Sequence, residues 1–336
     1  MNSWAGTMRT PNSAAAVEAG ASAASAGATA NAAGTGGVGR YAPSPTGDLH
    51  FGNLRTAVAA WLFARADGLG FVMRVDDLDS QRCREHFVDS QLADLQAIGL
   101  DWDDRGVELR QSDREAAYAA AVDKLAGQGL VYECYCSRKE IQQAASAPHQ
   151  LPGEYPGTCR DLSEAQRVKK REELAGQGRV PALRLRAGCS EFSITDRLHG
   201  EYTGRVDDFI VRRGGNAAQA RDYAYNLAVV VDDAHQQVTQ VVRGNDLLSS
   251  APRQAYLAQL LGLDAPEYAH VGLVVNADGQ RLAKRDGPIS LRTMPAARVV
   301  GEIFASIGCA GATSLHEALE SFCPEALADD YVWAGS

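Results

Sequence analysis

The chain has 336 residues with a formal net charge of −9, and 45% of its residues are hydrophobic. This length allows a full α/β core with a smaller appended unit. The acidic balance argues against broad, sequence-independent binding of nucleic acid, although it leaves room for a local basic patch. No apolar run reaches the length that spans a bilayer, so a membrane role is not expected.

Residues 1–36 consist almost entirely of alanine, glycine, serine, threonine and asparagine. Such a composition cannot form a packed core, and the segment lacks the basic start and apolar stretch of a secretory signal. We therefore expect a disordered extension, with the functional chain beginning near Gly37.

A proline-stiffened turn then leads into a helix; residues 40–53 read Arg-Tyr-Ala-Pro-Ser-Pro-Thr-Gly-Asp-Leu-His-Phe-Gly-Asn. The apolar residues at helical spacing are Leu54, Val58, Trp61 and Leu62. This spacing predicts a helix with one buried face. The free amides and positive dipole end at a helix N-terminus suit phosphate. His50 and Asn53 would project beside the anion, and Gly52 would let a ligand approach the backbone closely.

Strand and helix patterns alternate after this helix. They predict a strand at Gly70–Val75, a helix at 84–98, a strand at 107–110 and a helix at 113–128. The alternation indicates a parallel sheet with helices on both faces and ligands at the carboxyl ends of the strands. Later patterns predict strands at 183–186, 191–195, 209–213 and 238–242, a helix at 250–261, a strand and turn over 270–282, and two short helices in the tail. Residues 225–231 are apolar all round and fit either a helix or a strand.

Three of the seven cysteines lie close together, at Cys134, Cys136 and Cys159. This clustering indicates a metal site in a reducing cytoplasm rather than a disulfide framework. Two thiolates one residue apart cannot easily form a disulfide but can share a tetrahedral Zn²⁺. The fourth ligand is Tyr155, His149 or water, and general chemistry favours His149 because a protonated phenol is a poor ligand. The alternative is that the cysteines are simply buried.

The segment at 40–53 resembles the HIGH signature of class I aminoacyl-tRNA synthetases, in its glutamyl form. Arg281-Leu-Ala-Lys-Arg285 matches the second signature of that class, a mobile Lys-Met-Ser-Lys-Ser loop. The pattern Cys-x-Cys…Tyr-x-x-x-Cys is similar to that of glutamyl-queuosine tRNA(Asp) synthetases, which are short paralogues of glutamyl-tRNA synthetase. This likeness covers nearly all of 37–310, and it implies that Tyr155 completes a structural zinc site.

The resemblance implies a Rossmann-like α/β fold whose parallel sheet binds the nucleotide. We expect the halves of the catalytic domain at 37–130 and 206–290, an inserted zinc-binding subdomain of acceptor type at 131–205, and a short helical tail at 291–336. That tail is too short for a helical anticodon-binding domain.

A glutamate substrate needs an arginine for its side-chain carboxylate, and Arg40 and Arg243 are the candidates by position. The resemblance places the amino-acid site at Arg40, Ala42, Pro43, Ser44, Tyr225 and Arg243. Asp76 stands where the family usually has glutamate, so its contact with the substrate ammonium would be longer or water-mediated. The pair Asp232 and Asp233 is expected to cap a loop.

The resemblance implies that ATP, arriving with Mg²⁺, activates L-glutamate as the adenylate. His50, Asn53 and Lys284 would be catalytic, and Gly52 would also contact ATP. Glutamate would then pass to queuosine in the anticodon loop of tRNA(Asp), a single-stranded target, and a monomer is expected. The alternatives are a truncated glutamyl-tRNA synthetase that charges an acceptor stem, a catalytically weakened RNA-binding paralogue, and a small-molecule adenylate-forming ligase.

Overall fold

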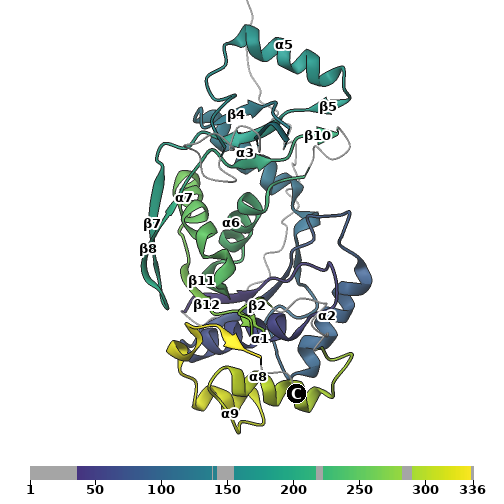
Figure 1. Ribbon diagram of the computed structural model, residues 1–336, viewed down its shortest axis with the longest axis vertical. Coiled ribbons are helices and arrows are strands. Elements are labelled where there is room, and N and C mark those ends of the chain that lie inside the picture. The colour runs from purple at the N-terminus through teal and green to yellow at the C-terminus, as the bar shows by residue number, and fades with distance from the viewer. Residues whose placement is uncertain (1–35, 138, 142–154, 217–221, 282–289, 334–336) are drawn as a thin grey trace, which may run out of the picture. The chain divides into compact units, whose positions relative to one another are not determined.

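The centre of the fold is a seven-stranded sheet (Figure 1). Across the sheet its strands are β3 (Leu109–Arg110), β2 (Gly70–Val75), β1 (Val38–Tyr41), β11 (Val238–Gly244), β12 (Glu267–Val271), β7 (Glu191–Asp196) and β8 (Gly200–Arg205). Neighbouring strands pair in parallel, except that β7 and β8 form an antiparallel hairpin. This computed structural model describes residues 36–137, 139–141, 155–216, 222–281 and 290–333.

The strand order creates a switch point between β1 and β11. From β1 the chain proceeds to β2 and β3 on one side, whereas β11 and β12 lie on the other side. The loops that leave β1 and β11 therefore diverge, and open α/β sheets bind their ligands in the crevice that this leaves at the carboxyl edge. The predicted Rossmann-like parallel sheet is confirmed.

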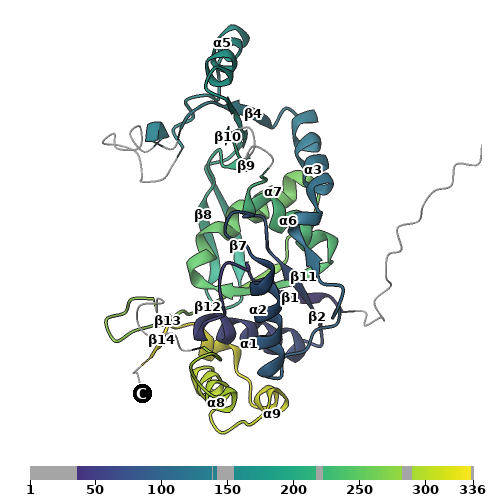
Figure 2. The ribbon, with the colours of Figure 1, turned by 90° about the vertical axis from the view of Figure 1, so that its right-hand side faces the viewer.

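Helices cover both faces of the sheet (Figures 1 and 2). One apolar core gathers side chains of α1 (Phe51–Ala66), α2 (Glu85–Ala97), α8 (Ala296–Ser306) and α9 (Leu315–Glu320). A second core gathers those of α3 (Glu115–Gly127), α6 (Tyr225–His235) and α7 (Ala251–Leu261). The apolar segment 225–231 is thus the start of helix α6, and its position between the sheet and other helices explains why it shows no polar face.

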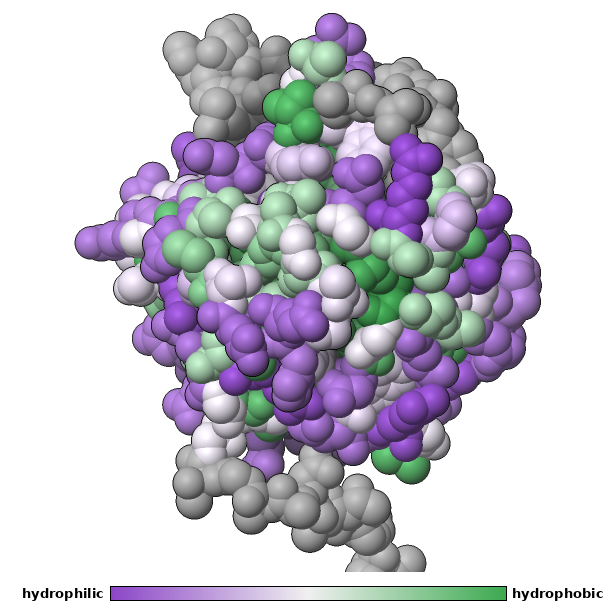
Figure 3. Space-filling model, turned by 90° about the horizontal axis from the view of Figure 1, so that it is seen from below, coloured by the Kyte–Doolittle hydropathy of each residue, from purple (hydrophilic) through white to green (hydrophobic). Residues whose placement is uncertain are grey.

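Helix α1 is enclosed on more sides than its sequence indicates. The predicted buried stripe is present, but the residues outside it that are also buried are Phe51, Arg55, Ala57, Ala59, Ala60, Phe63 and Ala64. The expectation of a single buried face was wrong, because β1, β2 and β11 pack on one side of α1 while α8 and α9 pack on the other. Figure 3 views the molecule from the side of α8 and α9, where apolar and polar residues are interspersed.

A smaller set of strands surrounds the cysteine cluster. These are β4 (Val131–Cys134), β6 (Ala182–Leu185) and β9 (Ile210–Arg212) in one antiparallel sheet, and β5 (Arg179–Val180) with β10 (Gly215–Asn216) in another. Helix α5 (Glu164–Ala175) begins at a capping box in which Ser163 and Gln166 satisfy each other's backbone amides. The predicted insert at 131–205 spans part of this set together with β7 and β8, which extend the main sheet; its boundaries stay a prediction.

Short elements complete the described chain. They are the 3-10 helices η1 (Gln111–Asp113), η2 (Asn245–Ser250) and η4 (Pro324–Leu327), and the strands β13 (Val274–Val275) and β14 (Tyr331–Val332), which pair in parallel. The tail therefore adds an unexpected strand to its two predicted helices, and Trp333 packs 4.9 Å from the ring of Phe51 at the start of α1. Among the residues described, no helix has the length and apolar character needed to cross a membrane.

Candidate active site

A cavity of about 390 Å³ opens at the switch point, at the carboxyl ends of β1 and β11. The sequence-predicted residues in its lining are Arg40, Ala42, Pro43, Ser44, His50, Gly52, Asn53, Tyr225 and Arg243. Asp76 lies outside that lining, and Lys284 lies outside the described residues. The structure thus brings together the predicted phosphate turn and most of the predicted amino-acid site.

The phosphate turn ends at His50, whose extended backbone precedes the first residue of α1. The Asn53 side-chain oxygen accepts the His50 backbone N–H over 3.3 Å, which fixes the start of the helix. A Cβ added at Gly52 would lie 3.2 Å from Cε1 of His50, so the imidazole rests directly against this glycine. The first turn of α1 carries no acidic side chain, which leaves its positive end available to an anion.

Two arginines and two aspartates form a buried charge network behind the cavity wall. Arg74 donates from Nε to Asp76 over 2.7 Å and from Nη1 to Asp233 over 2.5 Å. Arg40 donates from Nε to the same Asp233 oxygen over 3.2 Å. Burial acts to raise the pKa of Asp233, but the two arginines outweigh it and hold that pKa below its usual value.

The effect of burial on the carboxyl pKa is the larger one at Asp76, in contrast to Asp233. Burial raises its pKa to about 6, although Arg74 and Arg40 oppose the shift. Oδ1 is bound to Arg74, whereas Oδ2 has no hydrogen-bond partner among the described residues. A buried carboxylate oxygen without a donor is costly, and because Asp76 does not line the cavity, a water is the group that would link this atom to a ligand there.

Arg243 projects from the end of β11 into the cavity and is 5% exposed. Its Nε donates to Nε2 of His270 over 3.0 Å, while Nη1 has no partner within the described chain. Burial lowers its pKa, yet a guanidinium remains charged. Because Arg243 lines the cavity and contacts no carboxylate, its charge can pair with an anionic ligand there.

The second signature loop approaches the same cavity from β13. Arg281 forms an antiparallel bridge with Val275 and lines the cavity, and its guanidinium pairs with Asp246 of η2. Residues 282–289, including Lys284, lie outside the described residues. The predicted meeting of His50 and Lys284 around one nucleotide therefore stays a prediction, with Arg281 marking where the described part of the loop ends.

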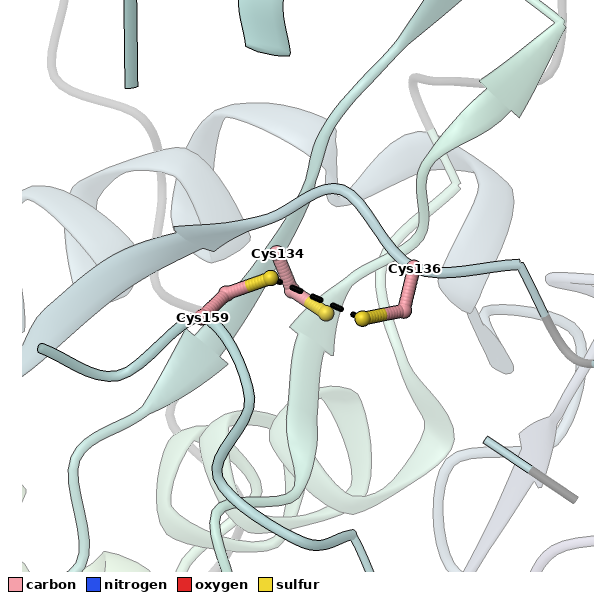
Figure 4. Close-up of side chains that lie close together, drawn as sticks. All are labelled: Cys134, Cys136 and Cys159. Carbon is pink, nitrogen blue, oxygen red and sulfur yellow. Dashed lines mark hydrogen bonds between the residues drawn. The ribbon is translucent and has the colours of Figure 1, made fainter. Parts of the chain in front are cut away.

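The three predicted zinc cysteines lie together (Figure 4). All three sulfur atoms are within 4.8 Å of one another, and Sγ of Cys136 lies 3.5 Å from Sγ of Cys159. Zinc–sulfur bonds of about 2.3 Å in a tetrahedral site separate the sulfurs by roughly 3.8 Å, so the cluster fits Zn²⁺ after small adjustments. Cys134 is the last residue of β4 and Cys136 lies two residues beyond it, with both thiols close to that of Cys159 (Figure 4).

Tyr155 supplies the only oxygen that the described residues place in hydrogen-bond contact with these thiols. Its hydroxyl lies 3.4 Å from Sγ of Cys134 and accepts the backbone N–H of Cys159 over 2.9 Å. Burial and the nearby Cys134 raise the pKa of this phenol, so a phenolate ligand would depend on the charge of the metal. His149 lies outside the described residues.

The comparisons with known proteins agree with this arrangement. A family model described as the catalytic domain of class I tRNA synthetases (E and Q) matches residues 38–298. The chain belongs to this synthetase family. A protein named Glutamyl-Q tRNA(Asp) synthetase from Nocardia farcinica is 62% identical over 256 residues, which cover 76% of this chain and 78% of that protein. A protein of the same name from Symbiobacterium thermophilum is 43% identical over 272 residues, which cover 77% of this chain and 81% of that protein.

Solved structures of glutamyl-tRNA synthetases share the fold of this synthetase. A glutamate tRNA ligase from Elizabethkingia meningosepticum, crystallised with its amino acid, superposes with a TM-score of 0.72 over 86% of this chain and 65% of its own. The glutamate-tRNA synthetase from Elizabethkingia anophelis superposes with a TM-score of 0.75, over 89% of this chain and 68% of its own. Both are 23% identical, so the likeness is one of fold alone. As a family member, the chain is a ligase of the aminoacyl-tRNA synthetase type.

Sequence reasoning missed part of the charge network of this synthetase. Asp233 and Asp232 were expected to cap a loop, but both lie in helix α6 and are buried. Asp233 neutralises Arg40 and Arg74, and Asp232 accepts hydrogen bonds from Gln111 and Tyr118. The expectation was wrong because the ambiguous segment 225–231 hid the helix that carries them. Two adjacent aspartates inside an apolar helix would have signalled buried partners.

Proposed function

We propose that this synthetase activates L-glutamate with ATP and Mg²⁺ and transfers the glutamate to the queuosine base in the anticodon loop of tRNA(Asp). The observation that carries the first step is the cavity that combines the N-terminus of α1 with the buried, carboxylate-free Arg243. The choice of RNA is supported by the relatives at 62% and 43% identity, which are named for that activity.

Glutamate carries one ammonium and two carboxylates, and the cavity offers a matching group for each kind of charge. Arg243 would receive the side-chain carboxylate, because Arg40 is already paired with Asp233. The free oxygen of Asp76 lies outside the cavity lining, so its contact with the ammonium would be long or would run through a water. Ser44 and Tyr225 would supply further hydrogen bonds from the lining.

In the activation step an oxygen of the substrate α-carboxylate attacks the α-phosphorus of ATP in line. The new O–P bond forms as the bond to pyrophosphate breaks, and Mg²⁺ on the phosphates spreads the negative charge. The protein supplies no nucleophile, so it acts through alignment and charge stabilisation. His50 and the first amides of α1 would stabilise the α-phosphoryl oxygens, Asn53 would hold that turn, and Lys284 would clamp the leaving pyrophosphate.

In the transfer step a hydroxyl of the queuosine cyclopentenediol attacks the activated carbonyl carbon. An ester bond forms, the bond to AMP breaks, and AMP leaves. An anticodon loop is single-stranded, so its bases can turn outward toward a cavity. Every group named in both steps comes from one chain, so we propose that a monomer suffices.

We also propose that Cys134, Cys136, Tyr155 and Cys159 hold one structural Zn²⁺. When bound, the ion would fix the end of β4 against the segment that carries Cys159. Four protein ligands leave no open position for a substrate, so the metal takes no part in the chemistry.

The decisive experiment incubates the protein with radiolabelled glutamate, ATP and bulk tRNA that either contains or lacks queuosine. We expect label only on queuosine-containing tRNA(Asp), attached to the anticodon loop. Label on the 3′ end of a glutamate tRNA would instead establish the acceptor-stem activity. An absence of glutamate-dependent ATP–pyrophosphate exchange without RNA would exclude the proposed activation step.

A further inference from the structure

Arg243 lies at the end of a line of buried polar side chains that crosses three strands. Its Nε donates to Nε2 of His270 over 3.0 Å, and Nδ1 of His270 lies 2.6 Å from Oδ2 of Asp196. The pairing of β11 with β12 places Arg243 beside His270, and β7 pairs with β12 through Asp196 and Tyr268, two residues before His270. All three side chains are at most 5% exposed, and neither His270 nor Asp196 lines the cavity.

The hydrogen-bond chemistry of this line fixes the protonation of the imidazole. A guanidinium Nε–H can only donate, so Nε2 of His270 must be a bare acceptor. Nδ1 then carries the single proton of a neutral ring and donates it to Asp196. Burial, together with the charge of Arg243, holds the pKa of His270 below its usual value despite the opposing effect of Asp196, which agrees with a neutral ring.

Asp196 uses both of its oxygens as acceptors. Oδ1 accepts the backbone N–H groups of Leu198 and His199 over 3.0 and 3.1 Å, while Oδ2 accepts from His270. These bonds fix the carboxylate at the end of β7 and make it an obligatory acceptor. The orientation of the imidazole, and with it the identity of its protonated nitrogen, is therefore set by Asp196.

Arg243 therefore has different partners from the other two buried arginines beside the site, Arg40 and Arg74. Arg40 and Arg74 share a carboxylate of Asp233 by direct contact. Arg243 instead meets an uncharged acceptor at Nε, and its Nη1 has no partner within the described chain. The guanidinium is thus held by His270 at Nε and by the carbonyl oxygen of Leu247 at Nη2, over 3.5 Å, while Nη1 keeps its hydrogen bonds for an anion.

We propose that Asp196 and His270 are positioning residues that hold Arg243 for the side-chain carboxylate of glutamate, and that the neutral imidazole makes the site prefer a carboxylate to a carboxamide. A carboxylate in place of the imidazole would neutralise Arg243 directly and remove that preference. The inference rests on the proposed function for the identity of the ligand and deepens it by naming two specificity residues that do not touch the substrate.

The first test is Asp196→Asn. An amide has a single acceptor oxygen, which cannot serve both the backbone amides and the imidazole. When the oxygen faces Leu198 and His199, the NH₂ donates to Nδ1 of His270, and the ring proton moves to Nε2, opposite the Nε–H of Arg243. We expect the KM for glutamate in ATP–pyrophosphate exchange to rise about tenfold or more, because a buried donor loses its acceptor, with the KM for ATP unchanged.

The second test changes His270 itself. In His270→Glu a carboxylate would face Arg243, and we expect the preference for glutamate over glutamine, measured as the ratio of kcat/KM values, to fall at least about tenfold. His270→Gln offers a neutral amide oxygen to the same Nε–H and should keep most of that preference. If His270 had only a packing role, the two variants, whose side chains are of similar size, would show the same preference for glutamate over glutamine.

Nitrogen-15 NMR of the histidines provides a readout that does not depend on activity. We expect His270 to be protonated on Nδ1 in the unaltered protein and on Nε2 in Asp196→Asn. Asp208→Asn is the matched control, because Asp208 is also buried and is bonded to Tyr132 and Arg160, none of which lines the cavity. It should lower stability without raising the KM for glutamate.

Several outcomes would overturn the inference. They are an Nε2 proton in the unaltered protein, an unchanged KM for glutamate in Asp196→Asn, and equal glutamate preference in the two His270 variants. If the unaltered protein shows Nδ1 protonation but no glutamate-dependent exchange, the proposed function fails while the positioning network stands. The two failures are therefore distinguishable.

Discussion

At the scale of single residues, the burial of Asp76 decides at which pH its carboxyl can pair with the substrate ammonium. Its carboxyl has a pKa of about 6 because burial disfavours the charged form. The acid is ionised above that pH and neutral below it, and only the ionised form can pair with a substrate ammonium. We expect kcat/KM for glutamate to fall about tenfold per pH unit below 6, because this ratio reports ionisations of the free enzyme.

The measurement is ATP–pyrophosphate exchange between about pH 5 and 8, in the range where a carboxyl with this shift titrates. Asp76→Asn should lower kcat/KM throughout and flatten the acid limb, because no carboxylate remains to protonate. An acid limb that persists unchanged in this variant would assign the ionisation to another group. The KM for ATP serves as the internal control.

The absence of a side chain at Gly52 leaves room for the imidazole of His50. Alanine at this position would place a Cβ 3.2 Å from the His50 ring, which must then move. We expect adenylate formation to fall by up to about tenfold, because the ring must shift by a fraction of the displacement of about 1 Å that costs about a hundredfold. The free energy of unfolding should change by at most about 1 kcal/mol, because alanine favours a helix.

The matched control is Gly127→Ala at the end of α3, where an added Cβ meets nothing within 4 Å. This variant should keep full activity. If both glycine variants were equally active, His50 would not depend on the space at Gly52.

At the scale of elements, the packing of α1 against β1 depends on a missing side chain. A Cβ at Gly39 would lie 2.7 Å from Cβ of Ala64. Gly39→Ala should therefore force the helix from the sheet and lower the free energy of unfolding by about 1–3 kcal/mol, the usual cost of overpacking. Urea titration gives the measurement, and Gly301→Ala in α8, where an added Cβ has open space, should instead stabilise by up to about 1 kcal/mol.

The cysteine cluster allows a prediction about the metal. We expect one zinc ion per chain by elemental analysis, and we expect Cys136→Ser to lose it because a hydroxyl is a poor substitute for a thiolate. Tyr155→Phe should weaken zinc binding if the phenol is a ligand and leave it unchanged if the fourth ligand lies elsewhere. Cys309→Ser is the control, because Cys309 is buried far along the chain in the core with α8 and α9.

The sequence predicted the elements whose signals are local. The strand at 70–75, helices α2 and α3, and the turn before α1 follow from spacing, capping and glycine or proline positions over a few residues. The cysteines and the phosphate turn were found for the same reason, since each motif lies on a short segment.

Long-range packing could not be predicted in this way. The cover over the second side of α1 comes from residues more than 200 positions away, and β14 is a two-residue strand whose partner is equally short. The partnership of Arg243 with His270 and Asp196 needs the order of strands across the sheet, which no local pattern contains. Its position in the sequence and the resemblance both indicated Arg243, but only the packing of the strands supplies the residues that hold it.

At the scale of the whole molecule, a chain with a net charge of −9 must bind a polyanion through a small number of local contacts. The groups proposed to bind glutamate are buried, where salt screens charges weakly. RNA contacts are exposed, and each phosphate on a single strand contributes about −0.7 to the slope of log affinity against log salt. Salt should therefore separate the two steps of the reaction.

We expect the KM for tRNA to rise about twentyfold between about 50 and 200 mM salt if three phosphates are contacted. Over the same range the KM for glutamate should stay within about twofold, because its partners are shielded from the ions. The comparison uses label transfer to RNA and ATP–pyrophosphate exchange on the same preparation. If the two KM values depended equally on salt, the amino-acid cavity would be open to solvent. If the KM for tRNA did not change with salt, the anticodon loop would be bound through its bases rather than through its phosphates.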